Sequence, residues 1–191
     1  MKQIEIEYKT LLSKKEFENL TQKFSTVPLI TQTNHYFDTK TSHLRKAKLS
    51  LRIRTFSDHA EMTLKIPQEV GNMEHNIPLS LEDAEQMIKR NKLKPNAITQ
   101  LLEDSGFKID SIVKKGDLTT HRRETLLPIG LMALDENHYS GIVDYELELE
   151  VSDPDQGKHA FEQFLAQEQI DFKYAKSKVA RFTQSILKDD A

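Results

Sequence analysis

Four segments of this chain alternate between apolar and polar side chains, and this pattern constrains the fold more than any other feature. The segments cover residues 2–9, 48–55, 60–66 and 141–151. Because successive side chains of a strand point to opposite faces, a period of two residues predicts β-strands with one apolar and one polar face. The polar faces carry Glu5, Glu7 and Lys9 in the first segment, Arg52 and Arg54 in the second, Thr63 and Lys65 in the third, and Glu146, Glu148 and Glu150 in the fourth.

Helical periodicity occupies several of the intervening stretches. Ser13 and Glu16 resemble a capping box ahead of a helix that runs to about residue 24. Further helices are predicted from Ser80, after Pro95 as far as Gly106, around residues 161–165 and around residues 179–186. Residues 67–76 and 152–158 contain Pro, Gly and Asx turn signals and are predicted to be loops. No fixed repeat divides the chain, so we expect residues 1–191 to form a single domain.

Two arrangements satisfy these patterns. In a two-layer α+β sheet, helices cover the apolar face and the charged face meets water, as antiparallel sheets often allow. The charges are sorted, however, because one strand carries three glutamates, another carries two arginines, and the first places two glutamates beside a lysine. If the sheet closes on itself with helices outside, these charges converge on an interior where they must be paired or bind ligands. Converging carboxylates then favour a divalent cation, and clustered Arg and Lys favour a polyanion.

Composition excludes several classes of protein. There are no cysteines, which excludes disulfides, thiolate nucleophiles and cysteine-ligated metals. The formal net charge of −3 argues against a general nucleic-acid binder, so we expect no DNA partner. No apolar stretch has the length to span a bilayer and no signal core is recognised, so we expect a cytoplasmic protein without membrane contact. The phosphate-binding patterns GxxxxGK[ST] and GxGxxG are absent, and the seven histidines show no metal-binding spacing.

The order of several motifs resembles that of the CYTH family, the triphosphate tunnel metalloenzymes. Glu5-Ile6-Glu7-Tyr8-Lys9 resembles the family's ExExK signature, and Leu51-Arg52-Ile53-Arg54 resembles its RxR strand. Further resemblances are found at Tyr36-Phe37-Asp38-Thr39, Thr63-Leu64-Lys65, Leu118-Thr119-Thr120-His121-Arg122, Leu134-Asp135, residues 144–150 and Lys176-Ser177-Lys178. The resemblance implies an α+β fold with a closed eight-stranded antiparallel β-barrel, helices packed outside, and a charged lumen that binds a triphosphate with a divalent metal.

The resemblance also implies roles for individual residues. The implied metal ligands are Glu5, Glu7, Asp135, Glu146, Glu148 and Glu150, whose oxygen atoms suit Mg²⁺ or Mn²⁺. The implied catalytic and substrate-binding residues, which would bind phosphate oxygens, are Lys9, Arg52, Arg54, Lys65, Arg122 and Lys176. Alternation leaves open whether Arg122 or Arg123 faces the lumen, and the family's spacing favours Arg122. Glu74, Lys178 and Arg181 are further candidates for the same surface.

The family includes thiamine, inorganic and RNA triphosphatases and class IV adenylate cyclases, so fold alone does not select one activity. We expect a metal-dependent triphosphatase acting on a small substrate such as tripolyphosphate, thiamine triphosphate or a nucleoside triphosphate. An adenylate cyclase and a non-catalytic sensor of polyphosphate or nucleotide are the alternatives. The sequence leaves open whether the protein is a monomer or a homodimer.

Overall fold

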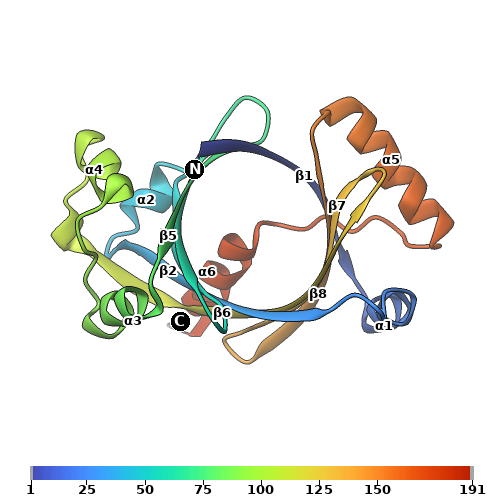
Figure 1. Ribbon diagram of the computed structural model, residues 1–191, viewed down its shortest axis with the longest axis horizontal. Coiled ribbons are helices and arrows are strands. Elements are labelled where there is room, and N and C mark those ends of the chain that lie inside the picture. Colours follow the sequence, from blue (N-terminus) through green and yellow to red (C-terminus); the bar gives the residue numbers. More distant parts are fainter. Residues whose placement is uncertain (1, 190–191) are drawn as a thin grey trace. The chain divides into compact units, whose positions relative to one another are not determined.

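Eight strands form a closed β-barrel in the computed structural model, which describes residues 2–189 (Figure 1). The strands are β1 (Lys2–Leu12), β2 (Leu29–Thr39), β3 (Ser50–Thr55), β4 (Ala60–Pro67), β5 (Asn72–Leu79), β6 (Ile112–Leu127), β7 (Gly130–Tyr139) and β8 (Ile142–Val151). They follow the order β1-β5-β4-β3-β2-β6-β7-β8 around the barrel, and pairs such as β3 with β4 and β7 with β8 are antiparallel. The predicted eight-stranded antiparallel barrel is therefore confirmed, and the open two-layer sheet is not.

Helices connect or follow these strands. They are α1 (Lys14–Lys23), α2 (His43–Lys46), α3 (Leu81–Arg90), α4 (Ala97–Asp104), α5 (Pro154–Gln167) and α6 (Lys178–Asp189), with a 3₁₀ turn at Ile109–Ser111. No helix within residues 2–189 has the length and hydropathy needed to cross a bilayer. By its internal contacts the chain divides into two compact units. Unit 1 contains residues 2–4 and 32–118, and unit 2 contains residues 5–31 and 119–189.

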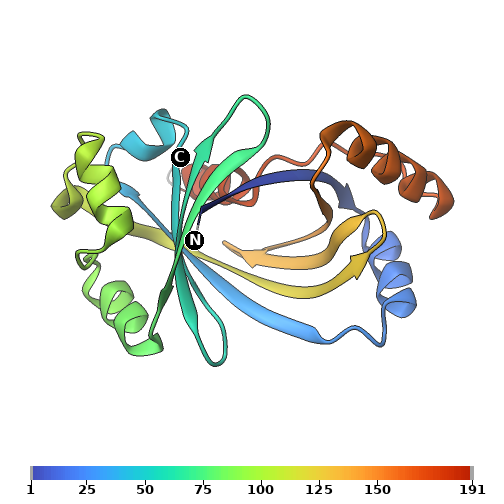
Figure 2. The ribbon, with the colours of Figure 1, turned by 45° about the horizontal axis from the view of Figure 1, so that its top comes forward.

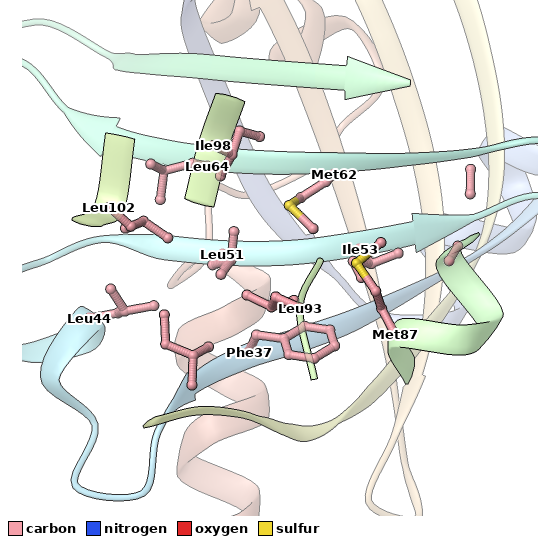
Figure 3. Packing of buried hydrophobic residues seen from close by; sticks show 13 residues of the cluster. Phe37, Leu44, Leu51, Ile53, Met62, Leu64, Met87, Leu93, Ile98 and Leu102 are labelled. Atoms are coloured by element: carbon pink, nitrogen blue, oxygen red, sulfur yellow. The ribbon is translucent and has the colours of Figure 1, made fainter. Parts of the chain in front are cut away.

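The core of unit 1 lies between β3, β4 and the two helices α3 and α4. Leu51 and Ile53 of β3 and Met62 and Leu64 of β4 are buried, as the period-two pattern predicts. Figure 3 shows these side chains beside those of Met87, Ile98 and Leu102 from the helices. The apolar faces of the two strands are therefore the faces that the helices cover.

The core of unit 2 is built in the same way from β7, β8, α1 and α5, which lie near one another in Figure 2. Leu147 and Leu149 of β8 are fully buried and belong to one cluster with Leu20 of α1 and Phe161 of α5. Aromatic rings extend this cluster, since Phe17 stacks on Tyr145 with ring centroids 4.5 Å apart. In both units the charged side chains therefore occupy the strand face opposite to the packed helices, which a closed barrel turns inward.

Two predicted loops are partly regular structure. Residues 72–76, predicted as loop, begin β5, and the actual turn is short, with the amide of Gln68 bonded to the carbonyl of Gly71. The predicted loop 152–158 contains the start of α5, where Asp153 caps the helix by accepting a bond from the amide of Gln156 at 2.8 Å. Pro154 then occupies the first turn. Asp followed by Pro is a helix-start signal as well as a turn signal, which explains the error.

Candidate active site

Strand register gathers the acidic and basic side chains of unit 2 on one face. Arg122 of β6 lies opposite Asp135 of β7, and Asp135 lies opposite Glu146 of β8. The next row places Glu148 of β8 opposite Lys9 of β1. Because directly opposed residues of antiparallel strands point to the same side, these five residues share the strand face opposite to the one that α1 and α5 cover.

Lys178 of α6 lies at the centre of this face. Its ammonium nitrogen is 2.9 Å from Asp135 Oδ2, 3.3 Å from Glu146 Oε1 and 2.7 Å from Glu148 Oε1. The Asp135 and Glu146 side chains have no exposed surface at all. Three carboxylates from two neighbouring strands therefore converge on one cationic atom.

The structure places Arg122, and not Arg123, in this cluster. Arg122 donates from Nε and Nη2 to the two oxygens of Asp135 at 2.8 and 2.7 Å, and from Nη2 to Glu148 at 2.7 Å. Arg123 points to the other face and donates to the backbone carbonyl of Val27. Arg122 also contacts Glu124, 3.1 Å away, an acidic residue of the same face that sequence analysis did not select.

A second basic side chain of α6 completes the cluster. Arg181 is one helical turn after Lys178 and donates to Glu146 and, at 2.9 Å, to Asp144. Asp144 in turn accepts bonds from Asn137 at 3.0 Å and from the hydroxyl of Tyr139 at 2.6 Å. Asp144 was not among the predicted ligands, although the alternation of Glu146, Glu148 and Glu150 extends back to it.

The predicted residues of β1 lie at the margin of the cluster. Lys9 forms an ion pair with Glu7 and lies 3.8 Å from Glu148. Glu150 of β8 is opposite Glu7 of β1. Glu5 lies two residues before Glu7 on β1 and therefore shares its face. Glu5 and Glu150 are half-buried.

Burial and charge shift the proton affinities within the cluster in opposite directions. Burial alone would raise the pKa of Glu148, but the neighbouring Lys178 and Arg122 hold it well below its usual range. Glu146 differs, because burial and the adjacent Glu148 raise its pKa to about 7 even though Lys178 lies beside it. Burial alone would lower the pKa of Lys178, but Asp135 and Glu148 raise it. Glu148 and Lys178 are therefore a charged pair, and Glu146 is the carboxylate that is most readily protonated.

Unit 1 carries a separate basic cluster on the charged face of β3 and β4. Lys65 lies opposite Glu74 of β5 in the strand register, and its ammonium is 2.8 Å from Glu74 Oε1. Arg52 approaches the same oxygen at 3.8 Å. Burial alone would raise the pKa of Glu74, but Lys65 and Arg52 hold it below its usual value. Glu74 thus serves as an anionic partner of two predicted phosphate-binding residues.

Arg54 is held by different partners. Its Nε donates to Asn34 Oδ1 on β2 at 2.9 Å, and its Nη1 donates to Glu61 Oε1 on β4 at 3.3 Å. Arg52, in contrast, has a buried Nε without a hydrogen-bond partner among the described residues. The three predicted basic residues of unit 1 therefore occupy one face, with a donor of Arg52 still available.

Lys176 does not join either cluster. Its side chain is exposed, and its backbone carbonyl accepts a hydrogen bond from Arg181. Lys178, two residues later, occupies the buried position between the carboxylates. The two lysines were hard to separate in sequence because the Lys-Ser-Lys segment lies just before and at the first turn of α6, where the strand period of two no longer applies.

The donor set of unit 2 has the chemistry of a divalent-metal site. Carboxylate oxygens are the ligands that Mg²⁺ and Mn²⁺ prefer, and Asp135, Glu146 and Glu148 already converge on a single cation. In this conformation the three carboxylates are bonded to Lys178, Arg122 and Arg181. Among residues 2–189 no group of three acidic or histidine side chains is arranged to hold a metal as it stands. The carboxylates of Asp135, Glu146 and Glu148 are therefore suitable metal ligands in their chemistry. To bind a metal together, they require the ammonium of Lys178 to move away.

Comparison with known proteins gives a consistent result. The family model of the CYTH domain matches residues 3–183 and so extends through both units. The Bacillus subtilis protein named "Putative triphosphatase YjbK" is 34% identical over 183 residues, which is 94% of each chain. A Bacillus halodurans crystal structure, named as a putative adenylate cyclase, is 32% identical with a TM-score of 0.89 and covers 95% of this chain and 98% of its own. The Hippeastrum protein HpAC1, 24% identical with a TM-score of 0.81 and 96% coverage of both chains, shares the fold. The chain belongs to the CYTH domain family.

Proposed function

We propose that the protein is a metal-dependent triphosphatase that hydrolyses a small triphosphate, namely inorganic tripolyphosphate, thiamine triphosphate or a nucleoside triphosphate. The observation that carries this proposal is the convergence of Asp135, Glu146 and Glu148 on one cationic atom. A buried set of carboxylates around a cation is the arrangement that a metal-chelated phosphate requires. The 34% identity to a Bacillus subtilis protein named as a triphosphatase supports the same activity.

The basic residues would bind the phosphate chain. In unit 1, Arg52, Arg54 and Lys65 share one strand face, and guanidinium groups match pairs of phosphate oxygens. In unit 2, Lys9 and Arg122 carry positive charge beside the carboxylates. These groups would neutralise the charge that develops on the leaving phosphate oxygens as water attacks the terminal phosphorus. With tripolyphosphate the products would be phosphate and diphosphate.

Asp135, Glu146 and Glu148 are the residues that would hold Mg²⁺ or Mn²⁺, with Glu7 and Glu150 nearby on the same face. The bound metal would supply charge neutralisation and orientation of the phosphate oxygens. Lys178 would leave its position between the carboxylates and, being positively charged, could itself bind a phosphate oxygen. Arg181 would remain anchored by Asp144.

An adenylate cyclase is the second candidate, because the Bacillus halodurans structure that shares 32% identity is named as one. In that reaction the ribose 3′-hydroxyl attacks the α-phosphorus and diphosphate leaves. The same basic and acidic residues would serve, since the two reactions differ in which phosphorus is presented to the nucleophile.

One incubation distinguishes these activities. Purified protein is incubated with tripolyphosphate or ATP and with Mg²⁺ or Mn²⁺, and phosphate, diphosphate and cyclic AMP are measured. Phosphate release supports the triphosphatase, cyclic AMP supports the cyclase, and binding without any product supports a sensor. Arg52→Ala should lose activity, whereas the exposed Arg90→Ala in the same unit should retain it. Equal activity in both variants would contradict the assignment of the basic cluster.

A further inference from the structure

Asn34 of β2 has a buried hydrogen-bond donor without a partner. The residue is 1% exposed, and its side-chain nitrogen Nδ2 has no hydrogen-bond partner among the residues that the structure describes. Buried side-chain donors are almost always bonded in folded proteins, because burial removes their bonds to water. An unpartnered donor at such a position therefore needs an explanation.

The orientation of this amide is fixed by Arg54. The Nε of Arg54 donates to Asn34 Oδ1 at 2.9 Å, and a guanidinium group can only donate. The oxygen of the amide must therefore face Arg54, which leaves Nδ2 pointing elsewhere. Exchanging the two amide atoms would place two donors against each other, so the unpartnered nitrogen does not result from a wrong rotamer.

A second unpartnered donor lies in the neighbouring cross-strand pair. Asn34 is opposite Arg54, and the next pair along on the same face joins Tyr36 to Arg52, whose buried Nε also has no partner among the described residues. The acidic side chains on this face already have partners, since Glu61 is paired with Arg54 and Glu74 with Lys65. Two unmet donors beside three cationic side chains call for an anionic oxygen from outside the chain.

We propose that Asn34 is a substrate-binding residue, which donates a hydrogen bond from Nδ2 to a phosphate oxygen while its Oδ1 holds the guanidinium of Arg54. This inference rests on the proposed function, since it takes the triphosphate as the ligand of the basic cluster. Asn34 thus has two roles that a substitution can separate, one as a donor to the substrate and one as an acceptor from Arg54.

The test must separate a lost donor from an added charge. Asn34→Asp keeps an acceptor for Arg54 and removes the donor, but it also adds a negative charge beside an anion site. Combining it with Glu61→Gln restores the net charge and again leaves Arg54 with a single carboxylate partner. The unmodified protein is therefore the charge-matched control, and Glu61→Gln alone measures the effect of the second substitution. Circular dichroism and thermal melting check that each variant is folded.

Binding is measured by calorimetry with diimidotriphosphate, a tripolyphosphate in which NH groups replace the bridging oxygens, together with Mg²⁺. We expect the double variant to bind about tenfold to a hundredfold more weakly than the unmodified protein, which has the same net charge, because one hydrogen bond to a charged oxygen is lost. Equal affinity of the double variant and the unmodified protein would overturn the role of Asn34 and leave the proposed function intact. If the unmodified protein does not bind the compound, the proposed function itself fails.

A second experiment observes ligand binding directly in the unmodified protein. The side-chain amide signals of Asn34 and Asn76 are followed by ¹⁵N NMR during titration with the same compound, with Asn34→Asp used to assign the first. Asn76 is the internal comparison, because its Nδ2 already donates to Glu74 at 3.2 Å. We expect the Asn34 signal to move downfield and the Asn76 signal to move less. An Asn34 signal that stays in place at saturation would overturn the inference.

Discussion

The ammonium of Lys178 lies 2.7 Å from Glu148 Oε1, and both side chains are only 12% exposed. This pair joins α6 to β8 through a charged contact that is largely shielded from water. Glu146 and Asp135 contact the same nitrogen, so one lysine offsets the repulsion among three carboxylates. In the proposed triphosphatase, this is the point at which a divalent cation would bind.

Replacing Lys178 should therefore destabilise the metal-free protein. Lys178→Met leaves buried carboxylates without their shared partner, and breaking a buried ion pair from one side costs about 3–5 kcal/mol. Urea denaturation in the presence of a chelator measures the change in the free energy of unfolding. Lys176→Met is the control, and because that side chain is exposed we expect a change within about 0.5 kcal/mol. Similar destabilisation by both substitutions would contradict the central position of Lys178.

Glu146 should make stability fall as pH rises through neutrality. Its pKa is about 7 in the folded protein and about 4.5 for an ordinary glutamate, so the folded state holds an extra proton between these values. The stabilisation from this group is therefore fully present below pH 4.5 and is lost as pH rises through 7, by about 3 kcal/mol at most. Glu146→Gln lacks this titration. The free energy of unfolding of the variant relative to the unmodified protein should increase from pH 5 to pH 8, and parallel pH profiles would contradict the raised pKa.

Gly157 of α5 should not tolerate a side chain, although alanine normally favours a helix. A Cβ atom at this position would lie 2.5 to 2.8 Å from three side-chain carbons of Val151 on β8. Overpacking of this kind costs about 1–3 kcal/mol, which exceeds the gain of about 1 kcal/mol expected for replacing a helical glycine. We expect Gly157→Ala to lower the free energy of unfolding.

Val151→Ala supplies the control for this contact. It opens space at the point of closest approach, so the double variant should be more stable than the sum of the two single changes, by about 1 kcal/mol. Thermal or urea denaturation of the four proteins completes the cycle. Simple additivity would show that α5 and β8 adjust without strain.

Much of the barrel was predictable because its strands show a pattern that depends only on local geometry. Leu51 and Ile53 on one side, with Arg52 and Arg54 on the other, indicate which face is covered whatever the partner strands are. β5 was missed because Pro78 and the polar His75 interrupt its alternation, and because its start at Asn72 adjoins turn signals. Its place in the sheet comes from hairpin pairing with β4, which depends on the partner strand as well as on its own sequence.

The site residues were predictable where the alternation of a strand determines which way a side chain points. They were not predictable where tertiary contacts determine it. Asp135, Glu146 and Glu148 meet as expected because they lie on adjacent strands in register. The choice of Lys178 over Lys176 depends on how α6 approaches the sheet, which no local period contains. Alternation alone did not select between Arg122 and Arg123, because a slip of one residue reverses every side chain, and the β6–β7 register places Arg122 opposite Asp135.

A bound triphosphate should stabilise the protein through the basic cluster of unit 1. Any ligand that binds only the folded state adds RT ln(1 + [L]/Kd), about 2.7 kcal/mol at a hundred times Kd. Diimidotriphosphate with Mg²⁺ should therefore raise the melting temperature. Arg52→Ala should reduce this rise in melting temperature sharply. The substitution removes the guanidinium group next to Glu74, including its unpartnered Nε.

The exposed Arg90→Ala is the matched control for that experiment, since it removes the same charge from the same unit at the last turn of α3. It should preserve the full rise in melting temperature, because an exposed charge away from the basic cluster is screened by salt. A rise that shrinks equally in both variants would indicate nonspecific attraction between a polyanion and positive charge. A rise that survives only when Arg52 is present would indicate a specific phosphate site, because the two variants carry the same net charge and differ in where the guanidinium was removed.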